Sequence, residues 1–244
     1  TVFKIILSKE KNFFLNYIKT IVELYNIKVL VSDLDNYSFL YTLKNKINSI
    51  KVFLIQNGHR GNSNDVFGKL EKNKKYKVDD FIVFNNDIKK KYENYVEANY
   101  HVLGSYKLSN FLRSFKAKKK IIPNISILFI SQYRDQEDKL NFVNTKIAGY
   151  LNKFSCENNL QFKINFFFKA NQLNLKKEKN YYKKSGISDK KFLINKNSYE
   201  SYKNLLKSKL VIACDTTMGY ESLSLQKKTI FLTIRENSTL RGCD

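Results

Sequence analysis

The chain has 244 residues, with 44 lysines and arginines against 22 acidic residues and a formal net charge of +22. Hydrophobic residues make up 43% of the chain and aromatic residues 14%, which excludes an intrinsically disordered protein and provides core for one large or two smaller domains. No run reaches the ~18 consecutive apolar residues that a membrane-spanning helix needs.

The first half of the chain alternates short apolar runs with amphipathic stretches. The apolar runs predict strands at Val2–Leu7, Ile27–Ser32, Ile50–Ile55, Phe81–Asn85 and Tyr100–Gly104. The amphipathic stretches predict helices at Phe13–Tyr25, Phe39–Ile47 and Asp87–Val96. Apolar strands separated by helices are typical of a parallel sheet covered on both faces.

The second half repeats this alternation. Strands are predicted at Ile125–Ile130, Phe162–Phe168, Lys191–Ile194, Leu210–Cys214 and Thr229–Thr233. Helices are predicted at Leu140–Phe154, Glu178–Lys184, Tyr199–Leu206 and Met218–Leu225. A second parallel sheet is therefore expected after residue 125.

Between the two series lies a segment with a lysine run and the only proline, Pro123. We predict an α/β protein of two Rossmann-like, doubly wound parallel-sheet units, at 1–110 and 125–244, joined by a linker at 111–124. The chain starts at Thr1 without a methionine and stops shortly after a predicted strand. We therefore expect a fragment of a longer chain, with the first unit incomplete at its start and the second at its end.

The types of basic residue limit what the positive charge indicates about binding partners. Of the 44 basic residues, 39 are lysines spread along the chain. We interpret the surplus as the codon bias of an AT-rich genome, and attraction to an anionic membrane remains open. Nucleic-acid binders concentrate charge and favour arginine, so no nucleic acid is expected as a partner. Three scattered cysteines indicate a reducing compartment, which predicts a cytoplasmic protein, with peripheral association with the inner membrane as an option.

In parallel sheets, ligands bind beyond the carboxyl ends of the strands, and one such end carries Gln56, Asn57, Gly58, His59 and Arg60. The glycine permits a close backbone approach to a ligand. The arginine can hold a carboxylate or phosphate, and the two amides suit sugar hydroxyls. The alternative is an ordinary turn with a surface arginine.

The first strand of the second half is followed by Ser131, Gln132, Arg134 and Asp135. Backbone amides and an arginine before a helix form an anion site, although the serine or the aspartate could equally be a helix cap. Lys169 ends the next strand, either as a counter-charge for a donor phosphate or as one more surface lysine.

A third strand end carries Asp215, Thr216, Thr217, Gly219 and Glu221. The threonine hydroxyls can bind phosphate or cap the following helix, and the glycine keeps its first turn open. The glutamate can accept a hydrogen bond from a ribose hydroxyl. The alternative is an imperfect capping box.

The remaining motifs are weaker. Asp33 and Asp35 follow a predicted strand and can supply a general base or open a turn. No dinucleotide-binding or P-loop glycine motif is present, and His59 and His101 are the only histidines. We therefore expect neither a metal site nor a bound cofactor.

Several motifs occur in an order that resembles bacterial surface-carbohydrate (O-antigen or capsule) biosynthesis proteins of the GT-B glycosyltransferase type, which are similar to retaining Kdo transferases. They are the segments Ile55–Arg60, Phe81–Asn85, His101–Ser105, Ile127–Arg134 and Asp215–Leu223. The last is the most specific, because the family tends to show Asp-Ser-Thr-Leu-Gly-Tyr-Glu there. Thr216 and Met218 are mild departures that retain a hydroxyl and an apolar contact.

The resemblance implies a metal-independent, two-domain GT-B enzyme that holds a nucleotide-sugar in its interdomain cleft. It would move a sugar, such as Kdo from its CMP conjugate, to a glycan or glycolipid acceptor of lipopolysaccharide O-antigen or capsule. The implied nucleotide contacts are Ser131, Arg134, Thr216, Thr217 and Glu221, and the implied acceptor contacts are Gln56, Asn57 and Arg60. The candidate catalytic carboxylates are, in order, Asp135, Asp33 and Asp35.

Two alternatives remain. One is a nucleotide-sugar epimerase or hydrolase on the same fold, because a fold does not determine a function. The other is a basic nucleic-acid-binding protein, whose affinity would fall steeply with salt.

Overall fold

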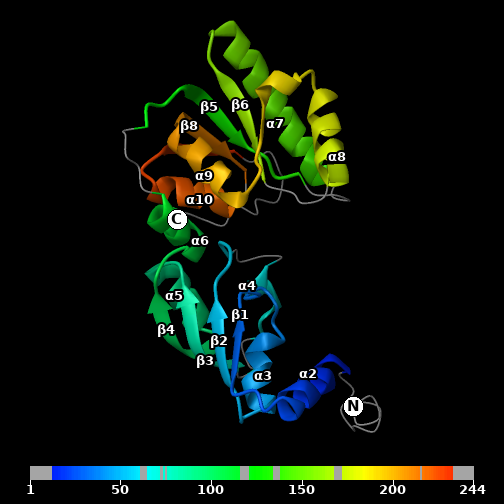
Figure 1. Cartoon of the computed structure of the whole chain (residues 1–244), viewed down its shortest axis with the longest axis vertical. Coiled ribbons are helices and arrows are strands. Elements are labelled where there is room, and N and C mark those ends of the chain that lie inside the picture. Colours follow the sequence, from blue (N-terminus) through cyan, green and yellow to red (C-terminus); the bar gives the residue numbers. More distant parts are fainter. Residues whose placement is uncertain are drawn as a thin grey trace. The chain divides into compact units, whose positions relative to one another are not determined.

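The computed structural model describes residues 13–60, 65–71, 74, 76–115, 121–133, 138–167, 172–214 and 216–232. The chain divides into two compact units, unit 1 (Thr1–Tyr106) and unit 2 (Lys107–Asp244) (Figure 1). The predicted strand Val2–Leu7 lies outside the described residues. Within these ranges, no helix is both long and apolar enough to cross a membrane.

Unit 1 contains a four-stranded parallel sheet in the order β1-β2-β3-β4. Its strands are β1 (Val29–Ser32), β2 (Lys51–Ile55), β3 (Tyr76–Val83) and β4 (Val96–Val102). Its helices are α2 (Phe13–Leu24), α3 (Leu40–Lys46), α4 (Val66–Lys69) and α5 (Asn86–Glu93). Sheet neighbours are therefore also neighbours in sequence.

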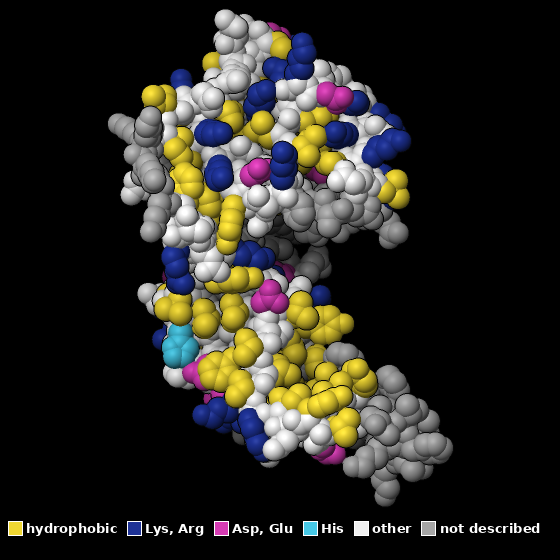
Figure 2. Space-filling model, in the orientation of Figure 1, with side chains coloured by type: hydrophobic (Ala, Val, Ile, Leu, Met, Phe, Trp, Pro, Cys, Tyr) yellow, Lys and Arg dark blue, Asp and Glu magenta, His cyan; other side chains and the backbone are white. Residues whose placement is uncertain are grey.

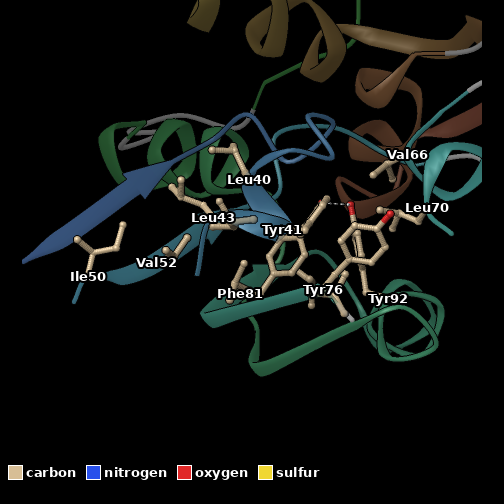
Figure 3. Packing of buried hydrophobic residues seen from close by; sticks show 14 of the residues in the cluster. Leu40, Tyr41, Leu43, Ile50, Val52, Val66, Leu70, Tyr76, Phe81 and Tyr92 are labelled. Atoms are coloured by element: carbon tan, nitrogen blue, oxygen red, sulfur yellow. Dashed lines mark hydrogen bonds between the residues drawn. The ribbon is translucent and has the colours of Figure 1, made fainter. Parts of the chain in front are cut away.

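The described part of unit 1 has one hydrophobic core, on one face of its sheet. Tyr41 of α3 is fully buried there, and its ring lies 6.0 Å from that of Phe81 on β3 and 6.2 Å from that of Tyr92 on α5 (Figure 3). Right-handed crossovers that all advance in one direction put their helices on the same face. The other face carries partly exposed ion pairs such as Lys77–Glu97. Within the described residues, the hydrophobic core of unit 1 therefore lies on one face of the sheet.

Unit 2 contains a five-stranded parallel sheet in the order β7-β6-β5-β8-β9. Its strands are β5 (Ile125–Ile130), β6 (Phe162–Phe166), β7 (Phe192–Ile194), β8 (Ser208–Ala213) and β9 (Lys228–Phe231). Its helices are α6 (Tyr106–Ser114), which begins at the last residue of unit 1, α7 (Asp138–Glu157), α8 (Gln172–Lys183), the 3-10 helix η1 (Asp189–Lys191), α9 (Ser198–Leu206) and α10 (Thr217–Ser224).

Two separate cores cover the two faces of this second sheet. Ile147 of α7 and Tyr182 of α8 pack on one face. Leu205 of α9 and Met218 of α10 pack on the other face. The central strand β5 is accordingly buried on both sides, with alternate residues in alternate cores. Unit 2 therefore has the predicted doubly wound arrangement.

The predicted linker at 111–124 needs correction at its start. Residues 111–114 belong to helix α6, and Phe111 is buried in unit 2, where its ring stacks on those of Phe115 and Tyr202 at 4.9 and 5.0 Å. Leu108, Phe111 and Phe115 follow the helical spacing that indicates a buried face. The lysine run at 116–120 lies outside the described residues.

Candidate functional site

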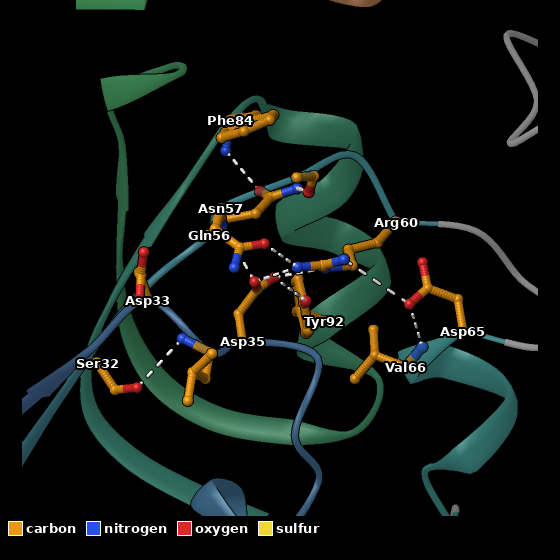
Figure 4. A network of polar contacts seen from close by, with 12 residues as sticks. Ser32, Asp33, Asp35, Gln56, Asn57, Arg60, Asp65, Val66, Phe84 and Tyr92 are labelled. Carbon is orange, nitrogen blue, oxygen red and sulfur yellow. Dashed lines mark hydrogen bonds and ion pairs between the residues drawn. The ribbon is translucent and has the colours of Figure 1, made fainter. Parts of the chain in front are cut away.

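A buried ion pair lies at the carboxyl ends of β1 and β2 in unit 1 (Figure 4). Asp35 is 0% exposed and Arg60 is 5% exposed. Arg60 Nε donates to Asp35 Oδ2 at 2.6 Å, and Arg60 Nη2 donates to Asp35 Oδ1. Two parallel bonds between a guanidinium and a carboxylate are the strong, geometrically specific form of this contact.

Further donors complete the surroundings of the Asp35 carboxylate. Tyr92 donates its hydroxyl to Oδ2 at 3.1 Å, and the backbone N–H of Asn57 donates to Oδ1 at 3.1 Å. Burial raises the pKa of Asp35, and the hydrogen bonds and charge of Arg60 oppose that rise. Burial lowers the pKa of Arg60, but the bonds to Asp35 outweigh it and the pKa is raised. Arg60 therefore stays charged and the pair is held together.

The loop after β2 uses its own polar side chains to fix its shape. Arg60 Nη2 also donates to Asn57 Oδ1 at 2.6 Å. Gln56 is buried, donates to the carbonyl of Gly58 at 2.7 Å and accepts from the N–H of Phe84 at 2.8 Å, which ties the loop to the end of β3.

This geometry changes the roles expected from the sequence. The Arg60 and Gln56 side chains lie inside the loop, and the wholly buried Asp35 has no surface for a reacting group. They act as structural supports instead of the predicted sugar-binding and catalytic residues. Asn57 and His59 are partly exposed in the same loop and stay candidates for contact with an acceptor sugar.

Asp33 differs from Asp35 although it lies only two residues away. It is exposed at the end of β1, and the Tyr106 hydroxyl lies 3.5 Å from its Oδ2. Burial, followed by the charge of Asp33, raises the pKa of Tyr106. Of the two aspartates after β1, only Asp33 can reach a ligand from solvent.

In unit 2, the strand order reverses between β5 and β8. These central strands pair in register, Phe129 with Ile212, so their carboxyl ends lie side by side. The chain leaves β5 toward β6 and β7 on one side, whereas β8 and β9 lie on the other. Such a reversal separates the following loops and is the usual ligand site of an open α/β sheet.

Ser131 follows β5 at this point, but its hydroxyl lies inside the unit. It is fully buried, donates to Glu178 and lies 2.8 Å from the Tyr182 hydroxyl. Burial raises the pKa of Tyr182 well above its ordinary value, so the phenol stays protonated as a partner. The Ser131 hydroxyl therefore joins β5 to α8 in place of the predicted phosphate contact. Gln132, the next residue, is largely buried.

Helix α10 begins beyond the carboxyl end of β8. Thr216 takes the N-cap position in extended conformation, but its side chain makes no capping hydrogen bond. Thr217 opens the helix and is partly exposed. The N-terminus of α10 therefore lies at the reversal point without a side-chain cap from Thr216, where its dipole favours an anion.

Glu221 and Gly219 have structural roles that the sequence interpretation missed. The buried Glu221 carboxylate accepts from the Tyr202 hydroxyl at 3.1 and 3.0 Å, which joins α10 to α9 instead of facing a ribose. A Cβ atom on Gly219 would lie 2.8 Å from the Ala213 Cβ and 2.7 Å from the Phe231 ring. This glycine therefore lets α10 pack closely on β8 and β9.

A cluster of asparagines lies at the ends of β6 and β7. Asn165 Oδ1 accepts from Asn195 Nδ2 at 3.0 Å and from Asn204 Nδ2 at 2.9 Å, and Asn165 Nδ2 lies 3.7 Å from the sulfur of Met218. Asn165 and Asn195 are buried. Sequence reasoning missed this cluster, although a polar residue inside the apolar run of β6 was a usable signal. Through the contact between Asn165 and Met218, the asparagine cluster lies against the first turn of α10.

The remaining predicted site residues lie outside the described residues. They are Arg134, Asp135, Lys169 and Asp215. Their predicted roles in anion binding and catalysis stay predictions.

An apolar groove of about 450 Å³ lies elsewhere in unit 1, between α2, β1 and the start of α3. Ile18, Leu30 and Tyr37 line it with other apolar side chains. Figure 2 shows hydrophobic side chains gathered over this part of unit 1. None of the predicted site residues lines this groove.

Comparison with protein families matches residues 53–243 to a family described as "putative O-antigen biosynthesis protein". The chain belongs to this family. The comparison with curated proteins gives no match.

Among solved structures, the chain is similar to the UDP-GlcNAc 2-epimerase of Methanocaldococcus jannaschii, crystallised with UDP-GlcNAc and UDP, with a TM-score of 0.56 and 14% identity over 93% of this chain and 66% of that one. A glycosyltransferase from Rickettsia africae gives a TM-score of 0.41 and 15% identity, over 92% of this chain and 64% of that one. The chain thus spans slightly less than two thirds of these proteins. This O-antigen biosynthesis protein has a GT-B-like fold of two parallel-sheet units.

Proposed function

We propose that this O-antigen biosynthesis protein is a glycosyltransferase that transfers a sugar from a nucleotide donor to a growing surface glycan. The observation that carries the proposal is the reversal of strand order between β5 and β8, with the N-terminus of α10 beside it. A nucleotide phosphate at that N-terminus would gain from the helix dipole and from first-turn N–H groups.

Three features of unit 2 support a phosphate at this position. The Thr216 side chain makes no capping hydrogen bond to α10, and the partly exposed Thr217 is the first residue of that helix. The hydrogen bond between Glu221 and Tyr202 and the close packing of Gly219 hold the helix in place. A preorganised donor set costs little reorganisation as the leaving phosphate gains charge. We further propose Arg134 and Lys169 as counter-charges.

Unit 1 would supply the acceptor side. Asn57 and His59 are partly exposed on a loop that the Asp35–Arg60 pair holds rigid. Asp33 is the exposed carboxylate after β1, and we propose it, after Asp135, as the group that stabilises an oxocarbenium-like transition state.

The structural similarity to an epimerase that binds UDP-GlcNAc makes UDP the first nucleotide to test. The prediction of Kdo from its CMP conjugate has the sequence resemblance as its only support. A screen must therefore contain both nucleotides.

Thermal unfolding with UDP, GDP, CDP and CMP and their sugar conjugates tests the nucleotide site. We expect one nucleotide class to stabilise the protein, by about 2.7 kcal/mol when the ligand is at 100 times Kd. Thr217→Val should weaken that nucleotide about tenfold or more, because a hydrogen bond to a charged phosphate contributes about 1.5–3 kcal/mol.

The control is Thr42→Val, in the first turn of α3 in unit 1, where the hydroxyl donates to the Phe39 carbonyl at 2.7 Å. It should retain the full nucleotide shift, measured against its own ligand-free melting temperature. No shift with any nucleotide, or equal loss in both variants, would contradict the proposed site.

The second candidate is a nucleotide-sugar epimerase, which the structural similarity favours. Incubation of the protein with the responding nucleotide-sugar alone distinguishes the two activities. An epimerase forms an isomeric nucleotide-sugar without an acceptor, whereas a transferase releases nucleotide only when acceptor glycan is added. Chromatography and NMR of the products decide between them.

A further inference from the structure

Helix α7 of unit 2 carries exposed aromatic residues along its solvent-facing side. Phe142, Tyr150 and Phe154 are 53%, 71% and 50% exposed, and they lie with Lys146 at intervals of four residues. Residues four apart share a helix face, so these side chains form one stripe. The opposite side of α7 is buried against the sheet through Ile147 and Ala148.

Lysines accompany the aromatic stripe. Lys146 lies over the Phe142 ring at 4.4 Å, and Lys153 lies beside Phe154 in the sequence. Helix α8 packs on the same face of the sheet and exposes Leu173, Lys176 and Lys177. On these surfaces the only described acidic side chain that is exposed is Glu157 of α7, and it pairs with Lys153 at 3.9 Å.

The unit that carries this stripe also carries most of the net positive charge of the chain. Unit 2 holds 27 of the 44 basic residues and 11 of the 22 acidic ones, which is 16 of the 22 surplus positive charges. Two of its acidic residues, Glu178 and Glu221, are buried and do not offset the surface charge. Figure 2 shows lysine and hydrophobic side chains interleaved on the surface of unit 2.

We propose that the exposed side of α7, extended by α8, is the surface by which the protein docks on an anionic lipid bilayer. A helix lying in the interface plane buries aromatic and aliphatic side chains at the headgroup boundary and directs lysines to anionic headgroups. The combination of aromatic rings with lysines separates this surface from the purely cationic faces that attract soluble polyanions. The inference does not depend on the proposed transferase activity.

The chain contains no tryptophan, so one introduced residue can report on one site. Tyr150→Trp places the reporter in the stripe, and Tyr25→Trp places it at an equally exposed position in unit 1, since both tyrosines are 71% exposed. Vesicles of phosphatidylcholine with phosphatidylglycerol should shift the emission at position 150 to the blue, and brominated lipid should quench it. The reporter at position 25 should show neither effect.

Vesicle co-sedimentation of the full chain tests the same surface without a reporter. Lys146→Gln with Lys153→Gln should weaken binding to anionic vesicles about fivefold per lysine. Tyr150→Ser with Phe154→Ser should weaken it about tenfold. The control, Lys203→Gln with Lys207→Gln, removes two exposed lysines at α9, which covers the other face of the sheet, and should change binding far less.

Three results would overturn the proposal. If the protein binds vesicles of phosphatidylcholine alone as strongly as anionic vesicles, the anionic bilayer is not its partner. Equal loss in the α7 and α9 variants would indicate diffuse charge attraction instead of a surface on α7. An emission shift at position 150 that grows with protein concentration without lipid would assign the stripe to contact with a second copy.

Discussion

Asp35→Asn should destabilise the protein by about 3–5 kcal/mol, because it removes the carboxylate that binds the buried guanidinium through two hydrogen bonds. Only the more distant Asp65, whose Oδ1 lies 3.8 Å from Arg60 Nη1, then remains as a counter-charge. Arg60 is 5% exposed and donates two hydrogen bonds to Asp35, so water has little access to its guanidinium and cannot replace the lost bonds. The amide keeps the size of the carboxylate but places a donor opposite a donor. Urea denaturation followed by circular dichroism measures the loss.

The effect should also be visible locally. The N–H of Asn57 donates to Asp35, so hydrogen exchange of peptides covering 56–60 should speed up in the variant. Glu97→Gln is the matched control, because its partner Lys77 is exposed and such surface pairs contribute about 0–1 kcal/mol. A loss in Asp35→Asn no larger than in Glu97→Gln would show that the pair does not support the loop.

Gly219→Ala should destabilise unit 2 by about 1–3 kcal/mol, the usual cost of forcing an extra carbon into a packed core. The new Cβ would lie under 3 Å from the Ala213 Cβ and from the Phe231 ring, so α10 must move away from the sheet. The helix propensity of alanine offsets at most about 1 kcal/mol of this cost. Because α10 carries Thr217, the variant should also lose nucleotide-dependent thermal stabilisation.

Gly149→Ala is a control for which we expect a gain in stability instead of a loss. Gly149 lies within helix α7, and a Cβ there would meet Ser185 at 3.9 Å, an ordinary contact distance. Without a clash, the substitution should stabilise the protein by about 0.5–1 kcal/mol. If both glycine variants shift stability in the same direction, the close approach of α10 to the sheet is not what Gly219 provides.

Much of the fold was predictable because its strands are short apolar runs between amphipathic helices. The predicted β5 has the observed bounds, Ile125–Ile130, and all other described strands overlap a predicted one. The errors occur where another signal dominated. The lysines and Pro123 predicted a linker, although the apolar spacing of residues 108–115 is helical. The N-terminal halves of β3 and β4 were not predicted as strands, because alternate residues there are polar and lie on the more exposed face of the sheet.

The positions of the candidate residues in the fold were predictable, but the contacts of their side chains were not. Gln56, Arg60, Ser131 and Glu221 do lie at or beyond the carboxyl ends of strands, as the parallel sheet requires. Their side chains point into the protein because they form hydrogen bonds with residues of distant segments, such as Arg60 with Asp35 and Glu221 with Tyr202. No local pattern encodes those pairings, since they depend on tertiary packing.

The two strand orders also have a consequence for the route by which the chain folds. In unit 1 each strand pairs with the next one in sequence, so the loops that must close are short. In unit 2 the central pairing joins Ile125 to Ser208, across the α-helices α7, α8 and α9 and the strands β6 and β7. Closing a longer loop costs more chain entropy before the favourable contacts of the paired strands can offset that cost. Pulse-labelled hydrogen exchange during refolding should therefore protect amides of β2 and β3 before those of β8, and protection in the reverse order would contradict this.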